Sequence, residues 1–120
     1  MKILVLATDY PNNQGHVTLM YIHSRCRYYA RCGIDVTVLN FSAKQSYTYQ
    51  DIRVITLAQY KQNPTGYDLL LSHAPNLRQH YIFLTKYIKN FKKIIFFFHG
   101  HEVLRSTEVY SKPYQYMQLE

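Results

Sequence analysis

The chain lacks any long hydrophobic run. No apolar stretch approaches the about 20 residues that a membrane-spanning helix needs. Residues 1–7 are mostly apolar, but they lack the extended hydrophobic region and the small-residue cleavage site of a signal peptide. We therefore expect a cytoplasmic protein, with at most a peripheral attachment to the inner face of a membrane.

Cysteine is scarce as well. Cys26 and Cys32 are the only two, and they stand six positions apart on one predicted helix. Side chains at that spacing point to different faces of a helix, so we expect no disulfide between them. A chain without disulfides fits a reducing compartment.

Acidic residues are missing from two long stretches. The formal net charge is +7, and no Asp or Glu occurs between Asp9 and Asp35 or between Asp68 and Glu102. Both gaps coincide with predicted helices, which are basic through Arg25, Arg27, Arg31, Arg78, Lys86, Lys89, Lys92 and Lys93. Such helices suit an anionic partner (phospholipid, nucleic acid or a phosphorylated ligand), and they are equally compatible with a solvated surface.

Several nucleotide-binding and catalytic motifs are also absent. The loop at residues 8–16 has one glycine where the dinucleotide fingerprint needs three, and no acid ends the second strand to hold a ribose. No Gly-Lys-Ser/Thr sequence forms a P-loop, and no G-x-S-x-G elbow presents a serine nucleophile. These motifs therefore assign no activity to the chain.

What is present is an alternation of strand and helix patterns. We expect strands at residues 2–7, 34–41, 53–57, 68–72 and 94–98, helices at 17–32 and 76–91, a short helix near 58–63, and a polar loop at 42–50. This alternation predicts an α/β fold: a three-layer Rossmann-like open parallel sheet with strand order 3-2-1-4-5 and helices on both faces.

The last expected strand ends abruptly in titratable residues. The apolar run at 94–98 is followed by His99, Gly100, His101 and Glu102. An all-apolar run is typical of a strand buried on both faces. In the expected order this strand stands at an edge of the sheet, so we expect another part of the protein to cover it.

Candidate binding residues gather where such sheets bind ligands, at the carboxyl ends of the strands. The loop at 8–16 is either a turn that aims backbone N–H groups at an anion or an ordinary connection to the next helix. His73 and His99 end the fourth and fifth strands on the same rim. Two histidines on one rim favour a ligand-contacting role over a purely structural one.

Two other kinds of site are not favoured. His99, His101 and Glu102 have the spacing of some zinc ligands, but the ligand run that usually follows is absent, so we expect no metal. Aromatic and basic residues interleave at 27–31, as in surfaces that stack on nucleic acid, but no nucleic-acid-binding module accompanies them.

Four segments stand in a characteristic order between residue 1 and about residue 105. They are KILVL at 2–6, followed by Tyr10-Pro11 and a glycine before a helix; ARCGIDVTVL at 30–39; YDLLLSH at 67–73; and HG at 99–100. Together they resemble the N-terminal, acceptor-side domain of GT-B glycosyltransferases, in the large retaining family (family 4-like) that includes the phosphatidylinositol mannosyltransferases.

The resemblance implies a domain at residues 1–105 and, at 106–120, a tail or the start of a connection to a C-terminal domain. That second domain would bind the nucleotide-sugar donor and carry an E-x7-E motif. The fragment alone is expected to be inactive and to need no metal or other cofactor. Its acceptor would be a glycan or a lipid-linked glycan.

The same resemblance assigns roles to individual residues. His99 is the expected catalytic residue beside the transferred sugar, and the substrate-binding residues are Asn13, Gln14, Gly15, His16, His73 and Gly100. The family usually has two adjacent glycines where this chain has Gln14-Gly15-His16. Relatives that act on lipid-linked acceptors dock on anionic membranes, which favours a docking patch of Lys86, Lys89, Lys92 and Lys93.

An alternative is a standalone flavodoxin-like module that binds a phosphorylated small molecule at residues 12–16 without catalysis. A phosphotransfer receiver is disfavoured, because such domains need clustered acids after the first strand and only Asp9 is near.

Overall fold

A fully apolar strand stands at the centre of the sheet. The computed structural model describes residues 1–64, 66–73 and 78–96. In it β1 (Lys2–Ala7) pairs in parallel with β2 (Asp35–Asn40) on one side and with β5 (Leu69–Ser72) on the other. Residues Ile3 to Ala7 are at most 2% exposed. A strand covered on both faces and both edges needs such an unbroken apolar run.

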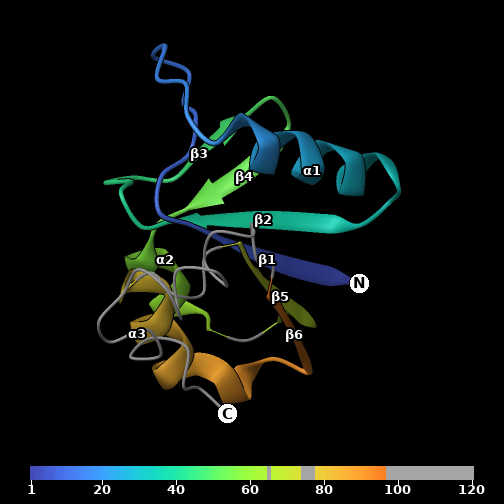
Figure 1. The fold of residues 1–120 in the computed structure, drawn as a ribbon, viewed down its shortest axis with the longest axis vertical. Coiled ribbons are helices and arrows are strands. Elements are labelled where there is room, and N and C mark those ends of the chain that lie inside the picture. Colours follow the sequence, from blue (N-terminus) through green and yellow to red (C-terminus); the bar gives the residue numbers. More distant parts are fainter. Residues whose placement is uncertain (65, 74–77, 97–120) are drawn as a thin grey trace, which may run out of the picture.

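The described sheet has six strands in the order β3-β4-β2-β1-β5-β6, with helices on both of its faces (Figure 1). The remaining strands are β3 (Tyr47–Tyr49), β4 (Ile52–Ile55) and β6 (Lys93–Phe96). The helices are α1 (Met20–Arg31), α2 (Leu57–Gln62) and α3 (Arg78–Tyr87), which continues into the short 3-10 helix η1 (Ile88–Asn90). The predicted α/β class is confirmed.

Side chains alternate between two cores, one on each face of the sheet. Ile3, Val5 and Ala7 of β1 pack with Ile22 and Cys26 of α1. The intervening Leu4 and Leu6 pack instead with a core that α2 and α3 supply through Tyr60, Phe83 and Leu84. The basic helices α1 and α3 therefore lie on opposite faces, as predicted (Figure 1).

The predicted sheet was incomplete at one edge. Residues 47–49, which were expected in a polar loop, form β3 and pair antiparallel with β4. The strand order therefore differs from the predicted five-strand order by this added edge strand. Alternation over three residues is too short to identify a strand by its period, and the pairing with β4 forms only in the folded chain.

Helix α1 is shorter than predicted because of the conformation at its start. Leu19 has φ 48°, a left-handed conformation that cannot continue a helix, so α1 begins at Met20 rather than at Val17. Its end follows the predicted glycine stop. Gly33, at φ 84°, donates its N–H to the Ala30 carbonyl, and Ile34 donates to the Tyr29 carbonyl. This pair of bonds is a Schellman motif.

The described edge strand β6 is less buried than its sequence suggested. Ile94, Ile95 and Phe96 are all half-buried, whereas the apolar run predicted full burial. The reason is position: β6 pairs with β5 alone among the described strands, so its other edge meets no strand there.

Cys26 is buried, Cys32 is exposed, and both are free thiols, as expected.

The hairpin from β3 to β4 turns through two residues in an unfavourable conformation. Tyr49 pairs with Ile52, and the residues between them, Gln50 and Asp51, have φ of 45° and 69°. Two-residue hairpin turns favour positive φ at both positions, but they normally use Asn and Gly there. The Gln50 side chain compensates by accepting a hydrogen bond from Nε2 of the buried His23 on α1, at 2.9 Å.

We predict that Asp51→Gly stabilises the protein by roughly 0.5–1 kcal/mol, because glycine adopts positive φ without steric cost. Gln50→Gly is the matched control. It relieves the same backbone strain but removes the bond to His23, so it should give no net gain. Urea unfolding followed by circular dichroism measures both, and equal stabilisation by the two variants would contradict this account.

Candidate functional site

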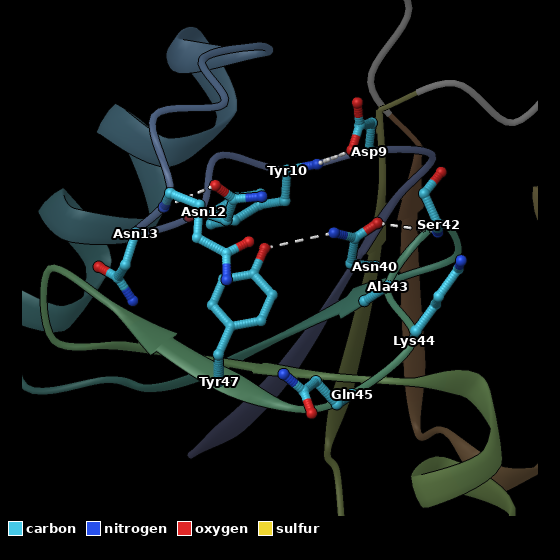
Figure 2. A pocket seen from close by; sticks show the side chains of 11 residues that line it. Asp9, Tyr10, Asn12, Asn13, Asn40, Ser42, Ala43, Lys44, Gln45 and Tyr47 are labelled. Atoms are coloured by element: carbon cyan, nitrogen blue, oxygen red, sulfur yellow. Dashed lines mark hydrogen bonds between the residues drawn. The ribbon is translucent and has the colours of Figure 1, made fainter.

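A polar pocket of about 540 Å³ lies over the carboxyl ends of β1 and β2 (Figure 2). We call it the amide pocket, because five of its lining side chains are carboxamides. The lining residues are Asp9, Tyr10, Asn12, Asn13, Gln14, Asn40, Ser42, Ala43, Lys44, Gln45 and Tyr47. They come from the loop after β1, the end of β2 and the segment leading into β3. The pocket therefore stands at the edge where open α/β sheets bind ligands.

The base of the amide pocket is held by Asn40, the last residue of β2. Asn40 is 3% exposed, and its Nδ2 donates to the Tyr47 hydroxyl at 3.3 Å while its Oδ1 accepts the Ser42 N–H at 2.9 Å (Figure 2). The Tyr47 hydroxyl donates in turn to the Pro11 carbonyl at 2.8 Å. Burial raises the pKa of Tyr47, so the phenol stays protonated at neutral pH. The base is thus a fixed network that joins all three lining segments.

The loop after β1 is organised by its own side chains. Asn12 Oδ1 accepts the backbone N–H groups of both Gln14 and His16, at 2.9 and 3.2 Å. Asp9 accepts the N–H of Tyr10 and pairs with His16, whose Nε2 lies 2.6 Å from the carboxylate. These N–H groups are therefore engaged within the loop. The geometry favours the ordinary-connection alternative over a turn preset to hold an anion.

The hairpin that the sequence did not reveal forms one wall of the amide pocket. Tyr47 stands on β3, and Asn13 Nδ2 donates to the Thr48 carbonyl at 2.8 Å, which links the loop after β1 to this strand. Lys44 and Gln45 precede the same strand and are exposed. Sequence reasoning missed five of the lining residues: Asn40, Ser42, Lys44, Gln45 and Tyr47. Asn40 ends a predicted strand but belongs to no motif, and the segment that holds the other four carries no strand or motif signal.

A buried chain of polar groups supports this wall from below. The Tyr10 hydroxyl lies 2.6 Å from Nδ1 of His23, and Nε2 of His23 contacts Gln50 in the hairpin turn. Since the Gln50 oxygen only accepts, His23 donates from Nε2 and accepts at Nδ1 from Tyr10. Burial raises the pKa of Tyr10, and it raises the pKa of Cys26 to about 12. Cys26 is therefore a protonated core thiol rather than a nucleophile.

A second polar cluster lies between β1 and β5, where the strand order reverses direction. Ser72 Oγ lies 2.7 Å from Nδ1 of His80 on α3, and Thr8 Oγ1 lies 3.4 Å from its Nε2. His80 is 1% exposed. Burial, and secondarily the neighbouring His73, lower the pKa of His80 to about 4. A neutral imidazole therefore joins the two strands to α3.

The predicted substrate-binding residues are only partly brought together. Asn13 and Gln14 line the amide pocket, while Gly15 and His16 lie in the same loop but not on the lining. His73 directly follows β5, but it is 1% exposed and contacts Tyr21 edge-on with ring centroids 6.3 Å apart. It does not line this pocket. His99 and Gly100 lie outside the described residues, as do residues 106–120.

The four lysines of the predicted docking patch are all exposed, but they lie away from the amide pocket. Lys92 directly precedes β6 and Lys93 is its first residue, and their N–H groups bond the Asp68 carbonyl just before β5. They thus mark the amino edge of the parallel sheet, opposite the pocket. Lys92 Nζ also lies 3.4 Å from the Asp68 carboxylate, which neutralises part of the patch.

Within residues 1–64, 66–73 and 78–96, no group of three or more His, Cys, Asp or Glu side chains is placed to hold a metal ion. Nor does any helix there have the length and apolar character to cross a membrane.

We predict that the stability of the protein falls between pH 7 and pH 5 partly through His80. Its pKa is lower in the folded state than the about 6.5 of an unfolded histidine, so the unfolded chain binds the extra proton first. The stability that neutral His80 contributes is present above pH 6.5 and is lost as the pH falls toward 4. The free energy of unfolding should be lower by about 2 kcal/mol at pH 5 through this group.

His80→Leu should therefore flatten the pH dependence of urea unfolding, whatever its effect at pH 7. Gln79→Ala is the control, because it changes an exposed neighbour that does not titrate. A His80→Leu variant that loses as much stability between pH 7 and pH 5 as the unmodified protein would contradict the assignment.

Comparison with protein-family models, with characterised proteins and with solved structures found no match to this chain. The amide pocket and the sequence resemblance described above are therefore the grounds for the function proposed below.

Proposed function

We propose that this chain is the acceptor-binding half of a glycosyltransferase and that the amide pocket holds the glycan part of the acceptor. The complete enzyme would transfer a sugar from a nucleotide-sugar donor, which a C-terminal domain of the same parent protein would bind. The observation that carries the proposal is the chemical character of the pocket lining, at the carboxyl edge of the sheet.

Carboxamides suit a polyhydroxylated ligand. A sugar hydroxyl both donates and accepts hydrogen bonds, and so does a carboxamide, through separate N–H and C=O groups. Gln14 and Gln45 are exposed on the lining and present both groups to a ligand, while the amides of Asn12, Asn13 and Asn40 also hold the pocket in shape through bonds of their own. The Asn40–Tyr47 network fixes the base of the pocket before a ligand arrives, which reduces the entropy lost on binding.

The lining fits a phosphorylated ligand less well. A phosphate only accepts hydrogen bonds and favours cations. Among the described residues, however, Lys44 is the single Lys or Arg on the lining, which also carries the Asp9 carboxylate. The nearby N–H groups of Gln14 and His16 are bound to Asn12. The flavodoxin-like alternative therefore has less support than the glycan-binding proposal.

The wider architecture supports the same interpretation. The parallel strands follow the order β4-β2-β1-β5-β6, which is the 3-2-1-4-5 arrangement of Rossmann-like domains when the antiparallel β3 is set aside. The pocket stands at the edge where a facing second domain would complete a cleft. The lysine patch at the other edge would attach an anionic surface without covering the pocket, and only its member Lys92 pairs with a carboxylate among the described residues.

The test is saturation-transfer NMR with neutral disaccharides (maltose, cellobiose, lactose and mannobiose), with inorganic phosphate as a competitor. We expect saturable binding of at least one disaccharide that phosphate does not displace. Gln14→Ala combined with Gln45→Ala should weaken this binding about fivefold or more, because each change removes a hydrogen-bonding side chain from the lining.

Gln62→Ala, at an exposed position of α2 outside the pocket, should leave the affinity unchanged. Binding of none of the disaccharides would contradict the proposal, and displacement by phosphate would favour the alternative.

A further inference from the structure

A second concave site lies on the opposite face of the sheet from α1, between α2 and α3. It has a volume of about 210 Å³ and is lined by Phe41, Leu57, Lys61, Gln79, Ile82, Phe83, Lys86 and Tyr87. We call it the α2–α3 groove. None of these residues belongs to the amide pocket.

The floor of the groove is a preformed aromatic surface. Phe83 is 2% exposed and stands edge-on to Phe41, with ring centroids 6.1 Å apart. Its ring also lies 4.9 Å from that of Tyr87. The wall at Ile82 is open, because this side chain is 40% exposed. An apolar ligand would therefore cover the exposed part of Ile82 without first rearranging the buried rings.

The charge at the groove is positive. Lys61 and Lys86 are exposed, and each stands in the last turn of its helix. No Asp or Glu occurs in α2 or α3, and none lines the groove among the described residues. An apolar floor with two lysines and no acid is complementary to an apolar chain that ends in an anionic head.

We propose that the α2–α3 groove binds a single fatty carboxylate, with the alkyl chain against Phe41, Ile82 and Phe83 and the carboxylate beside Lys61 and Lys86. The volume of the groove sets the length of the alkyl chain that it can hold. At about 30 Å³ per heavy atom, the groove accommodates a segment on the order of seven atoms, so a fatty acid of medium chain length fits. A concave site of this size accepts one chain rather than the surface of a bilayer. The proposal is independent of the glycan proposal, since the two sites share no residue.

The test is a titration of the ¹⁵N-labelled protein with octanoate, monitored through the amide signals of Leu57, Ile82 and Phe83. We expect saturable shifts of these signals. Lys61→Gln combined with Lys86→Gln should weaken octanoate binding about fivefold, as expected for two exposed ion pairs, and should leave octan-1-ol binding unchanged. The control is Lys89→Gln combined with Lys93→Gln, which removes the same charge outside the groove and should leave both affinities unchanged.

Substitution of the open wall separates the chain contact from the charge contact. Ile82→Asn should weaken octanoate and octan-1-ol alike, by about fivefold or more, while Val17→Asn, at another exposed apolar position outside the groove, should affect neither. The proposal is overturned if octanoate produces no saturable shifts, or if the control lysine pair matters as much as Lys61 and Lys86. It is also overturned if only vesicles of anionic phospholipid, and not octanoate, shift these signals.

Discussion

The structure depends on the burial of β1 on both faces and along both edges. Every residue from Ile3 to Ala7 is enclosed, so no polar side chain fits before the strand ends. The neighbouring strands turn polar near the same edge. Asn40 ends β2 opposite Ala7, and Ser72 ends β5 opposite Leu6, so both strands end in a polar side chain close to the end of β1. Polar chemistry is thereby concentrated at the carboxyl edge.

That edge holds two polar clusters with different characters. Over β1 and β2, carboxamides and hydroxyls surround an open pocket, and their fixed hydrogen bonds shape its base. Between β1 and β5, Thr8, Ser72 and His80 form a closed cluster whose neutral histidine ties α3 to the sheet. The first cluster is accessible to a ligand, whereas the second holds the scaffold together. The basic helices α1 and α3 lie on opposite faces of the sheet (Figure 1).

Most of the fold could be predicted because long apolar patterns determine it. The apolar runs of β1, β2 and β5 and the apolar stripe of α1 are local signals that burial then enforces. The wall of the amide pocket could not be predicted, because β3 spans three residues and its turn uses Gln50 and Asp51 instead of Asn and Gly. The loop after β1, predicted as a site element, lines the amide pocket through Asn12, Asn13 and Gln14. Its engaged N–H groups depend on the side chain of Asn12, whose direction the sequence does not specify.

The central claim is that the open polar pocket at the carboxyl edge is the ligand site. Amide chemical-shift mapping with the disaccharide that binds tests it most directly. The account predicts that the signals of Asn12, Asn13, Ser42, Lys44 and Gln45 shift together along one saturation curve, while those of Lys89 and Lys93 at the other edge stay in place. Shifts centred on any surface other than this lining would contradict it.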